Sequence, residues 1–135
     1  MLTIESKTVT AKGSQKNIFD YITDFRNFSG LLPEERLNDL EISREIIRFG
    51  LQGLGTVGLV IREKVPYSEV IITATEDSTA DFNFRILIRE SDTDRSEVKM
   101  ILQANLNMFL EMIAKEPLQK FADLVVDKLS EVEFQ

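Results

Sequence analysis

Hydrophobic positions along the chain change their spacing three times. After a first alternating stretch from Leu2 to Ala11, they recur every three or four residues as far as Asp39, as in a helix. From Leu40 they alternate with polar residues, as in strands with one buried face, and from Asn105 to Gln135 the helical spacing returns. The pattern predicts a strand, two short helices, a run of strands and one long helix.

The last segment is expected to be one long amphipathic helix, with Asn105 or Asn107 as its N-cap. Its apolar positions recur at spacings of three and four, which predicts a single stripe facing the rest of the protein. The stripe consists of Met108, Phe109, Met112, Ile113, Leu118, Phe121, Ala122, Val125 and Leu129. Pro117 lacks a backbone donor, so a bend or break is expected near Lys115 and Glu116.

The first strand has an inconsistent alternation. Leu2 and Ile4 share one parity and Val9 and Ala11 share the other, so if both pairs face inward, a bulge near Ser6 or Lys7 must absorb one residue. Gly13 then ends the strand. Ser14 is expected to cap a helix whose inner face is Ile18, Phe19, Ile22 and Phe25. The segment Asn27 to Asp39 predicts a short second helix wrapped in turns, covering one end of the core.

Strands are predicted from alternating apolar residues within the following ranges: Leu40–Ser43, Glu45–Leu51, Leu54–Lys64, Glu69–Thr75, Asp81–Arg89 and Val98–Leu106. The loops between them are too short for crossovers, which predicts an antiparallel meander. A sheet of six or seven twisted strands curls, and the long helix is large enough to fill its concave side. The fold class is therefore α+β, with residues 1–135 expected to form a single domain.

Composition excludes several kinds of function. The net charge of −7 disfavours binding to nucleic acid and to anionic membranes. Cysteine and histidine are absent, which removes disulfides, thiolate metal sites and the commonest general base. We therefore expect no metal, no cofactor and no assigned catalytic residue. No signal peptide or apolar run long enough to cross a membrane is present, so a cytoplasmic protein without membrane insertion is expected.

The segment Gly53 to Val60 matches the G-x-G-x-x-G pattern of nucleotide-binding loops. The dinucleotide-binding version must open a helix, whereas here a strand follows. The kinase version requires further motifs that this chain lacks. We therefore expect these glycines to serve a tight hairpin and a sharply bent strand, where a side chain would collide with the facing helix.

The order of elements resembles the START-like superfamily of helix-grip folds, which includes lipid-transfer domains and polyketide cyclases. Two stretches carry the resemblance, Val9-x-Ala11-x-Gly13-Ser14 with Ile18-Phe19 and Asp24, and Asn105-Leu106-Asn107-Met108 with Lys115-Glu116-Pro117-Leu118. The resemblance implies a cavity between the sheet and the terminal helix that holds an apolar or amphipathic molecule. A shared fold leaves the function open.

Our main hypothesis from the sequence is non-enzymatic binding or transport of a small hydrophobic molecule. Met and Phe side chains make adaptable apolar walls, and the residues expected to contact the ligand are Phe82, Phe84, Met100, Phe109, Met112 and Phe121. A dry, fully packed core is the alternative interpretation of the same residues.

Two other functions are kept open. A cyclase- or hydratase-like enzyme would need a buried polar group such as Tyr21 or Asp24. We instead expect these two residues to satisfy backbone groups at a helix end. Asn83 and Arg85 are expected on the solvent-exposed face of the sheet. A protein-interaction module, including a homodimer, would use apolar residues of the outer strand parity if they cluster. These residues are Ile46, Val60, Leu87 and Ile101.

Overall fold

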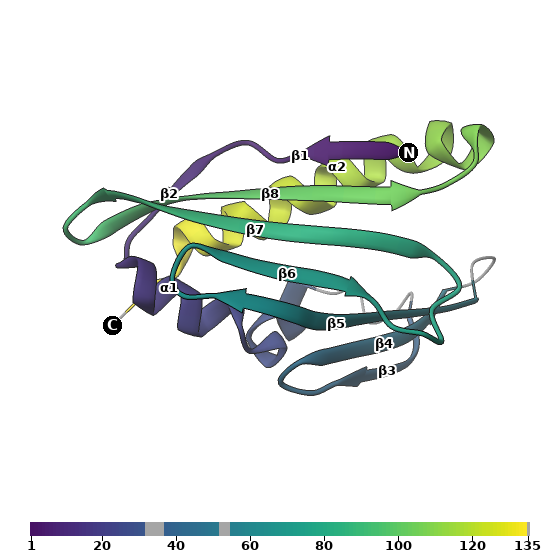
Figure 1. Ribbon diagram of the computed structural model, residues 1–135, viewed down its shortest axis with the longest axis horizontal. Coiled ribbons are helices and arrows are strands. Elements are labelled where there is room, and N and C mark those ends of the chain that lie inside the picture. Colours follow the sequence, from purple (N-terminus) through teal and green to yellow (C-terminus); the bar gives the residue numbers. More distant parts are fainter. Residues whose placement is uncertain (32–36, 52–54, 135) are drawn as a thin grey trace.

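A computed structural model of the protein describes residues 1–31, 37–51 and 55–134. These residues form a curved antiparallel sheet with helices packed on one side (Figure 1). The strands are β1 (Leu2–Glu5), β2 (Val9–Ala11), β3 (Asn38–Ile42), β4 (Ile46–Leu51), β5 (Gly55–Val65), β6 (Glu69–Ala74), β7 (Asp81–Asp92) and β8 (Arg95–Asn105). The helical elements are α1 (Gln15–Ile22), the 3-10 helix η1 (Phe25–Leu31) and α2 (Met108–Glu131). The predicted α+β class and the helix-grip arrangement are confirmed.

The described residues form eight strands rather than the six or seven predicted, because the first one is divided. The sheet order is β1-β8-β7-β6-β5-β4-β3, and β2 also pairs with β8. Leu2 lies opposite Ala104, and without a shift Val9 would lie opposite Glu97; instead it lies opposite Val98. The predicted one-residue bulge between the two halves is therefore confirmed.

Ser6 holds this bulge in place. Its backbone N–H donates to the Met100 carbonyl, and its hydroxyl accepts from the Met100 N–H at 2.8 Å. The same hydroxyl donates to the Lys7 carbonyl. The break in pairing thus leaves the backbone of β8 satisfied, and both halves of the divided strand can turn apolar side chains inward.

The first helix begins at the predicted cap, since the Asn17 N–H donates to the Ser14 hydroxyl at 3.2 Å. Ile18, Phe19 and Ile22 are buried as predicted. Phe25 is also buried, but it lies in η1 and not on α1, because the helix ends at Ile22. The short second helix predicted within Asn27 to Asp39 is η1, and residues 32–36 of that range lie outside the described residues.

The long helix α2 starts at Met108, with Asn107 as its cap, and continues through Pro117 without a break. The Leu110 N–H donates to the Asn107 side-chain oxygen at 2.9 Å. The helix α2 packs against β8, β1 and β2, whereas α1 packs against β7 and β6. Figure 1 shows α2 running along one face of the sheet, with the C-terminal residues returning to the region of α1.

The predicted apolar stripe of α2 is buried only in its C-terminal half. Ala122, Val125 and Leu129 are buried, as is Val126. In the N-terminal half, four stripe residues are instead more than half exposed, namely Met108, Phe109, Met112 and Ile113. The prediction of one inward stripe was wrong here, because spacing identifies a helical face but not how far the sheet extends beneath it.

Residues 55–60 of the glycine-rich segment lie in β5, a strand as expected, whereas Gly53 and Leu54, where the tight hairpin was expected, are outside the described residues. Gly55 has a φ of +81°, a conformation that favours glycine. A Cβ on Gly58 would collide with the Thr75 side chain at the end of the neighbouring strand. The expected collision with the facing helix was therefore wrong, although the reason for glycine, close approach of a neighbour, is the one predicted.

Candidate ligand-binding cavity

An apolar cavity of about 50 Å³ lies between the sheet and the helical elements. Residues from five strands, η1 and α2 surround it. They are Phe25, Phe28, Ile47, Leu59, Ile72, Phe84, Ile86, Met100, Phe121 and Val125. None of these described residues carries an ionisable or hydrogen-bonding side chain, so the part of the wall that the structure describes can contact apolar matter but supplies no acid, base or nucleophile.

Strand register brings the sheet side of the cavity together. Ile86 pairs with Met100 across β7 and β8, and Phe84 pairs with Ile72 across β7 and β6. Each of these pairs points to the same face because antiparallel partners share a side of the sheet. The alternation in each strand thus places an inward apolar residue at the same level of neighbouring strands.

Aromatic rings close the cavity on the helical side. Phe121 of α2 lies 6.2 Å from Phe84, centroid to centroid, which joins helix and sheet. Phe25 and Phe28 enter from η1 and are almost completely buried. Tyr21 packs edge-on against both Phe28, at 6.0 Å, and Phe134, at 5.3 Å. The position of η1 therefore determines one wall of the cavity.

The six residues that the sequence proposed as ligand contacts are divided by the structure. Phe84, Met100 and Phe121 line the cavity. Phe82 stacks on Phe84 with ring centroids 5.4 Å apart and is half-buried, outside the lining. Phe109 and Met112 are 70% and 79% exposed on α2, so the structure does not bring them to the cavity.

Sequence reasoning did not single out the other lining residues. Ile47, Leu59, Ile72 and Ile86 occupy alternating apolar positions within the predicted strands, but alternation does not say which level of the sheet faces a void. Phe25 and Phe28 belong to η1, whose path over the sheet depends on tertiary packing. The available signal was the cluster of three phenylalanines between residues 19 and 28, all of which are buried.

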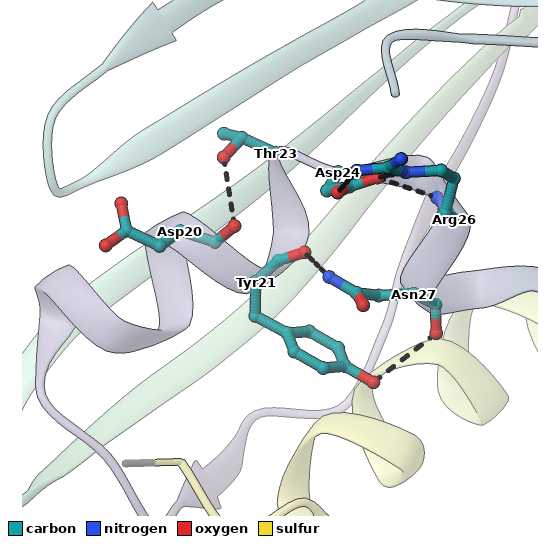
Figure 2. Close-up of polar contacts among 6 residues, drawn as sticks. All are labelled: Asp20, Tyr21, Thr23, Asp24, Arg26 and Asn27. Carbon is teal, nitrogen blue, oxygen red and sulfur yellow. Dashed lines mark hydrogen bonds and ion pairs between the residues drawn. The ribbon is translucent and has the colours of Figure 1, made fainter. Parts of the chain in front are cut away.

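The polar residues proposed for an enzyme lie at the junction of α1 and η1, as Figure 2 shows. The Tyr21 hydroxyl donates to the Asn27 carbonyl at 3.3 Å, and the Asn27 amide donates to the Tyr21 carbonyl at 2.8 Å. Asp24 accepts from the Arg26 backbone N–H at 3.1 Å and from its guanidinium at 2.6 and 2.9 Å. Thr23 donates to carbonyls of α1. These contacts satisfy backbone groups at the helix end, as expected.

The protonation of this cluster follows from its contacts. Hydrogen bonding from Arg26 lowers the pKa of Asp24 to about 2, so the carboxylate is ionised and engaged at neutral pH. Burial raises the pKa of the Tyr21 phenol, which keeps it protonated. Neither residue lines the cavity. The hydrogen bonds of these residues therefore stabilise the turn from α1 into η1.

The outer face of the sheet matches the sequence predictions only in part. Arg85 is partly exposed and pairs with Glu69 at 2.8 Å. Asn83 differs from the expectation, since its side-chain oxygen is buried and has no hydrogen-bond partner among the described residues. The outward apolar residues form two pairs. Ile46 lies opposite Val60, whereas Leu87 and Ile101 are diagonal neighbours on β7 and β8, beyond β6.

Across residues 1–31, 37–51 and 55–134, no three acidic side chains gather in a way that could hold a metal ion. Within the same ranges, no helix combines the length and the apolar character needed to cross a membrane.

The chain has the START-like fold, as solved structures with low sequence identity show. A START superfamily protein from Mycobacterium smegmatis is 15% identical, with 94% of this chain and 98% of that chain covered and a TM-score of 0.61. Truncated norcoclaurine synthase from Thalictrum flavum is 12% identical, covering 97% and 94%, with a TM-score of 0.64. The Aha1 dimer from Colwellia psychrerythraea is 14% identical, covering 97% and 98%, with a TM-score of 0.61.

No protein-family profile and no curated protein sequence matches the chain. The similarity therefore defines a scaffold that other proteins use for ligand binding or for catalysis, and the function has to be argued from this chain's own residues.

Proposed function

We propose that the protein binds a small apolar molecule in the cavity beneath α2 and does not alter it chemically. The observation that carries this proposal is the lining, in which all ten of the described residues have apolar side chains. An apolar ligand gains free energy from every part of its surface removed from water, whereas a polar one would lose its hydrogen bonds.

Cavity size limits the ligand. The space of about 50 Å³ is smaller than the roughly 150 Å³ of an engineered apolar cavity that admits benzene. A ring-sized ligand therefore requires the walls to separate. Phe121 is half-buried on α2 and Phe28 lies in the short helix η1, so movement of these two side chains enlarges the space without breaking the sheet.

An enzyme of the cyclase or hydratase type is the weaker proposal. Norcoclaurine synthase shows that a similar scaffold is used by an enzyme. Such chemistry needs ionisable groups facing the bound molecule. Tyr21 and Asp24 instead bond to Asn27 and Arg26 at the surface side of η1.

The proposal is tested by thermal and urea unfolding with benzene, indole and a medium-chain fatty acid as probes. A probe present at about a hundred times its dissociation constant adds roughly 2.7 kcal/mol to the free energy of unfolding. We expect Ile86→Phe, which fills the cavity, to abolish this gain. Ile88→Phe is the matched control, since Ile88 is equally buried on the same face of β7 but lies outside the lining.

The two variants also differ without a probe. Ile88→Phe overpacks a filled region, which costs about 1–3 kcal/mol, whereas Ile86→Phe places its extra atoms in empty space and costs less. The proposal is wrong if none of the probes stabilises the wild-type protein, or if Ile86→Phe retains the full stabilisation.

A further inference from the structure

The N-terminal half of α2 presents apolar side chains to solvent. Phe109 is 70% exposed, Met112 79% and Ile113 57%, and further along the helix Leu124 is 48% exposed. Together with Met108 at the start of α2, these are the exposed large apolar side chains of the helix, and the cavity lining does not include them. Large apolar groups gathered on one exposed face mark an interaction surface.

Two charged residues lie between these apolar groups. Ile113, Glu116, Lys120 and Leu124 follow one another at spacings of three and four, so they occupy one face of the helix. The side chains of Glu116 and Lys120 are 80% and 76% exposed, and they pair with each other at 3.2 Å. We call the set formed by Phe109, Met112, Ile113, Glu116, Lys120 and Leu124 the outer α2 stripe.

We propose that the outer α2 stripe docks against the same stripe of a second copy of this chain, with the two helices antiparallel. A two-fold axis crossing the stripe midway between Glu116 and Lys120 places each of these residues opposite the other in the second copy. The same operation places Met112 and Ile113 opposite Leu124. In such an interface each contact occurs twice, once in each direction.

The order of charged and apolar residues along the stripe favours a second copy of this chain as the partner. Along the stripe the chemistry runs apolar, acidic, basic, apolar, which is its own complement when the direction is reversed. The two central charges would form a four-membered network across the interface, shielded by apolar contacts on both sides. A lipid surface fits less well, because the carboxylate of Glu116 would enter the interface and the chain carries a net charge of −7.

The surface differs from the outer sheet face, where Ile46 and Val60 are separated by β6 from Leu87 and Ile101. It also shares no residue with the cavity lining, to which α2 contributes Phe121 and Val125. Dimer formation and ligand binding can therefore be tested independently.

The experiment is sedimentation of the whole protein over a wide concentration range, with folding of every variant confirmed by circular dichroism. The wild-type mass is expected to rise from 15.5 kDa towards twice that value as concentration increases. Glu116→Lys and Lys120→Glu each place like charges opposite one another, and each is expected to weaken the dimer at least about tenfold. Ile113→Ser is expected to weaken it as well, whereas Val65→Ser, at an exposed site on β5, leaves it unchanged.

Mixing the two charge variants provides the decisive result. One copy then carries two lysines and the other two acids at these positions, so the antiparallel pairing is complementary again and a mixed dimer forms. The ion pair between residues 116 and 120 within one helix is lost in both variants, and mixing does not restore it. A mixed dimer would therefore show that the charges pair between two copies. The proposal is overturned if the wild-type protein remains monomeric at every concentration, whether or not it floats with lipid vesicles. It is also overturned if Glu116→Lys and Ile113→Ser leave the dimer's dissociation constant unchanged, or if mixing the two charge variants forms no dimer.

Discussion

Ser6 shows how one small polar side chain lets a strand change register without losing hydrogen bonds. Its hydroxyl is buried, donates to Lys7 and accepts from the Met100 N–H. The bulge turns Leu2 and Ile4 inward in β1 and still permits Ala11 to be buried in β2. An apolar residue at this position would leave the Met100 N–H without this acceptor.

Ser6→Ala is therefore expected to lower the free energy of unfolding by about 1–3 kcal/mol, since it leaves a buried donor unsatisfied. Urea denaturation measures this change. Thr3→Ala, at an exposed site in β1, is the control and should stay within about 0.5 kcal/mol of the wild type. Equal effects of the two substitutions would contradict the role given to Ser6.

Asp24 predicts a pH dependence. Its pKa is about 2 in the folded protein, lowered by hydrogen bonding to Arg26, against an ordinary value of 3.8. A lowered folded-state pKa contributes stability that is complete above pH 4 and is lost as the pH falls from 4 towards 2. The pair faces solvent, so the contribution is at most about 1 kcal/mol.

Asp24→Asn is the variant that tests this dependence. The difference in free energy of unfolding between wild type and Asp24→Asn should be largest near neutral pH and shrink below pH 4. Urea midpoints measured at several pH values give the curve. A difference that is constant from pH 7 to pH 3 would mean that the carboxylate's charge contributes nothing.

At the scale of elements, the two halves of α2 differ in how much of their apolar surface is buried. Its C-terminal half buries Ala122, Val125, Val126 and Leu129 against the sheet, whereas its N-terminal half exposes large apolar residues. In the strands too, a neighbouring segment decides which residue fits at a position. Gly58 lies within β5, where the Thr75 side chain occupies the space that a Cβ would need.

Gly58→Ala is expected to destabilise the protein by about 1–3 kcal/mol, because the strand or Thr75 must shift to accommodate the methyl group. Gly50→Ala in β4 is the matched control, since a Cβ there would make ordinary contact with the Asn38 side chain at 3.4 Å. Thermal unfolding compares the two. If Gly58→Ala costs no more than Gly50→Ala, close packing is not the reason for glycine in β5.

For the whole molecule, the cavity is the space left where a curved sheet, η1 and one half of α2 meet. Met100 lines it from β8 and is only 2% exposed, while Leu102, two residues along the same strand, is 1% exposed and outside the lining. The two positions therefore offer large-to-small substitutions of similar burial, one that widens the cavity and one that does not.

Met100→Ala and Leu102→Ala should each cost about 2–5 kcal/mol in stability. Only Met100→Ala is expected to increase the affinity for benzene or indole, because it removes atoms from the cavity wall. Calorimetric titration of both variants measures this. An equal gain in affinity at both positions would show that any void in this core accepts such probes and that the cavity has no special role.

Much of the fold was predictable because it depends on local chemistry. Ser14 and Asn107 cap helices, and the alternation in Asp81–Arg89 follows from a sheet with one buried face. The parity change between Ile4 and Val9 was sufficient to predict the bulge. By contrast, the site was predicted only in part. Phe84, Met100 and Phe121 reach the cavity, whereas Phe109 and Met112 do not.

The sequence alone determined which side chains avoid water and with what period, and so the order of strands and helices. Tertiary structure decided which of those apolar faces is covered, because coverage depends on where the sheet ends beneath α2 and on how η1 crosses it. The same helical spacing that buries Val125 leaves Met112 79% exposed. A periodic pattern specifies a direction around a helix, and only the arrangement of distant segments specifies what lies in that direction.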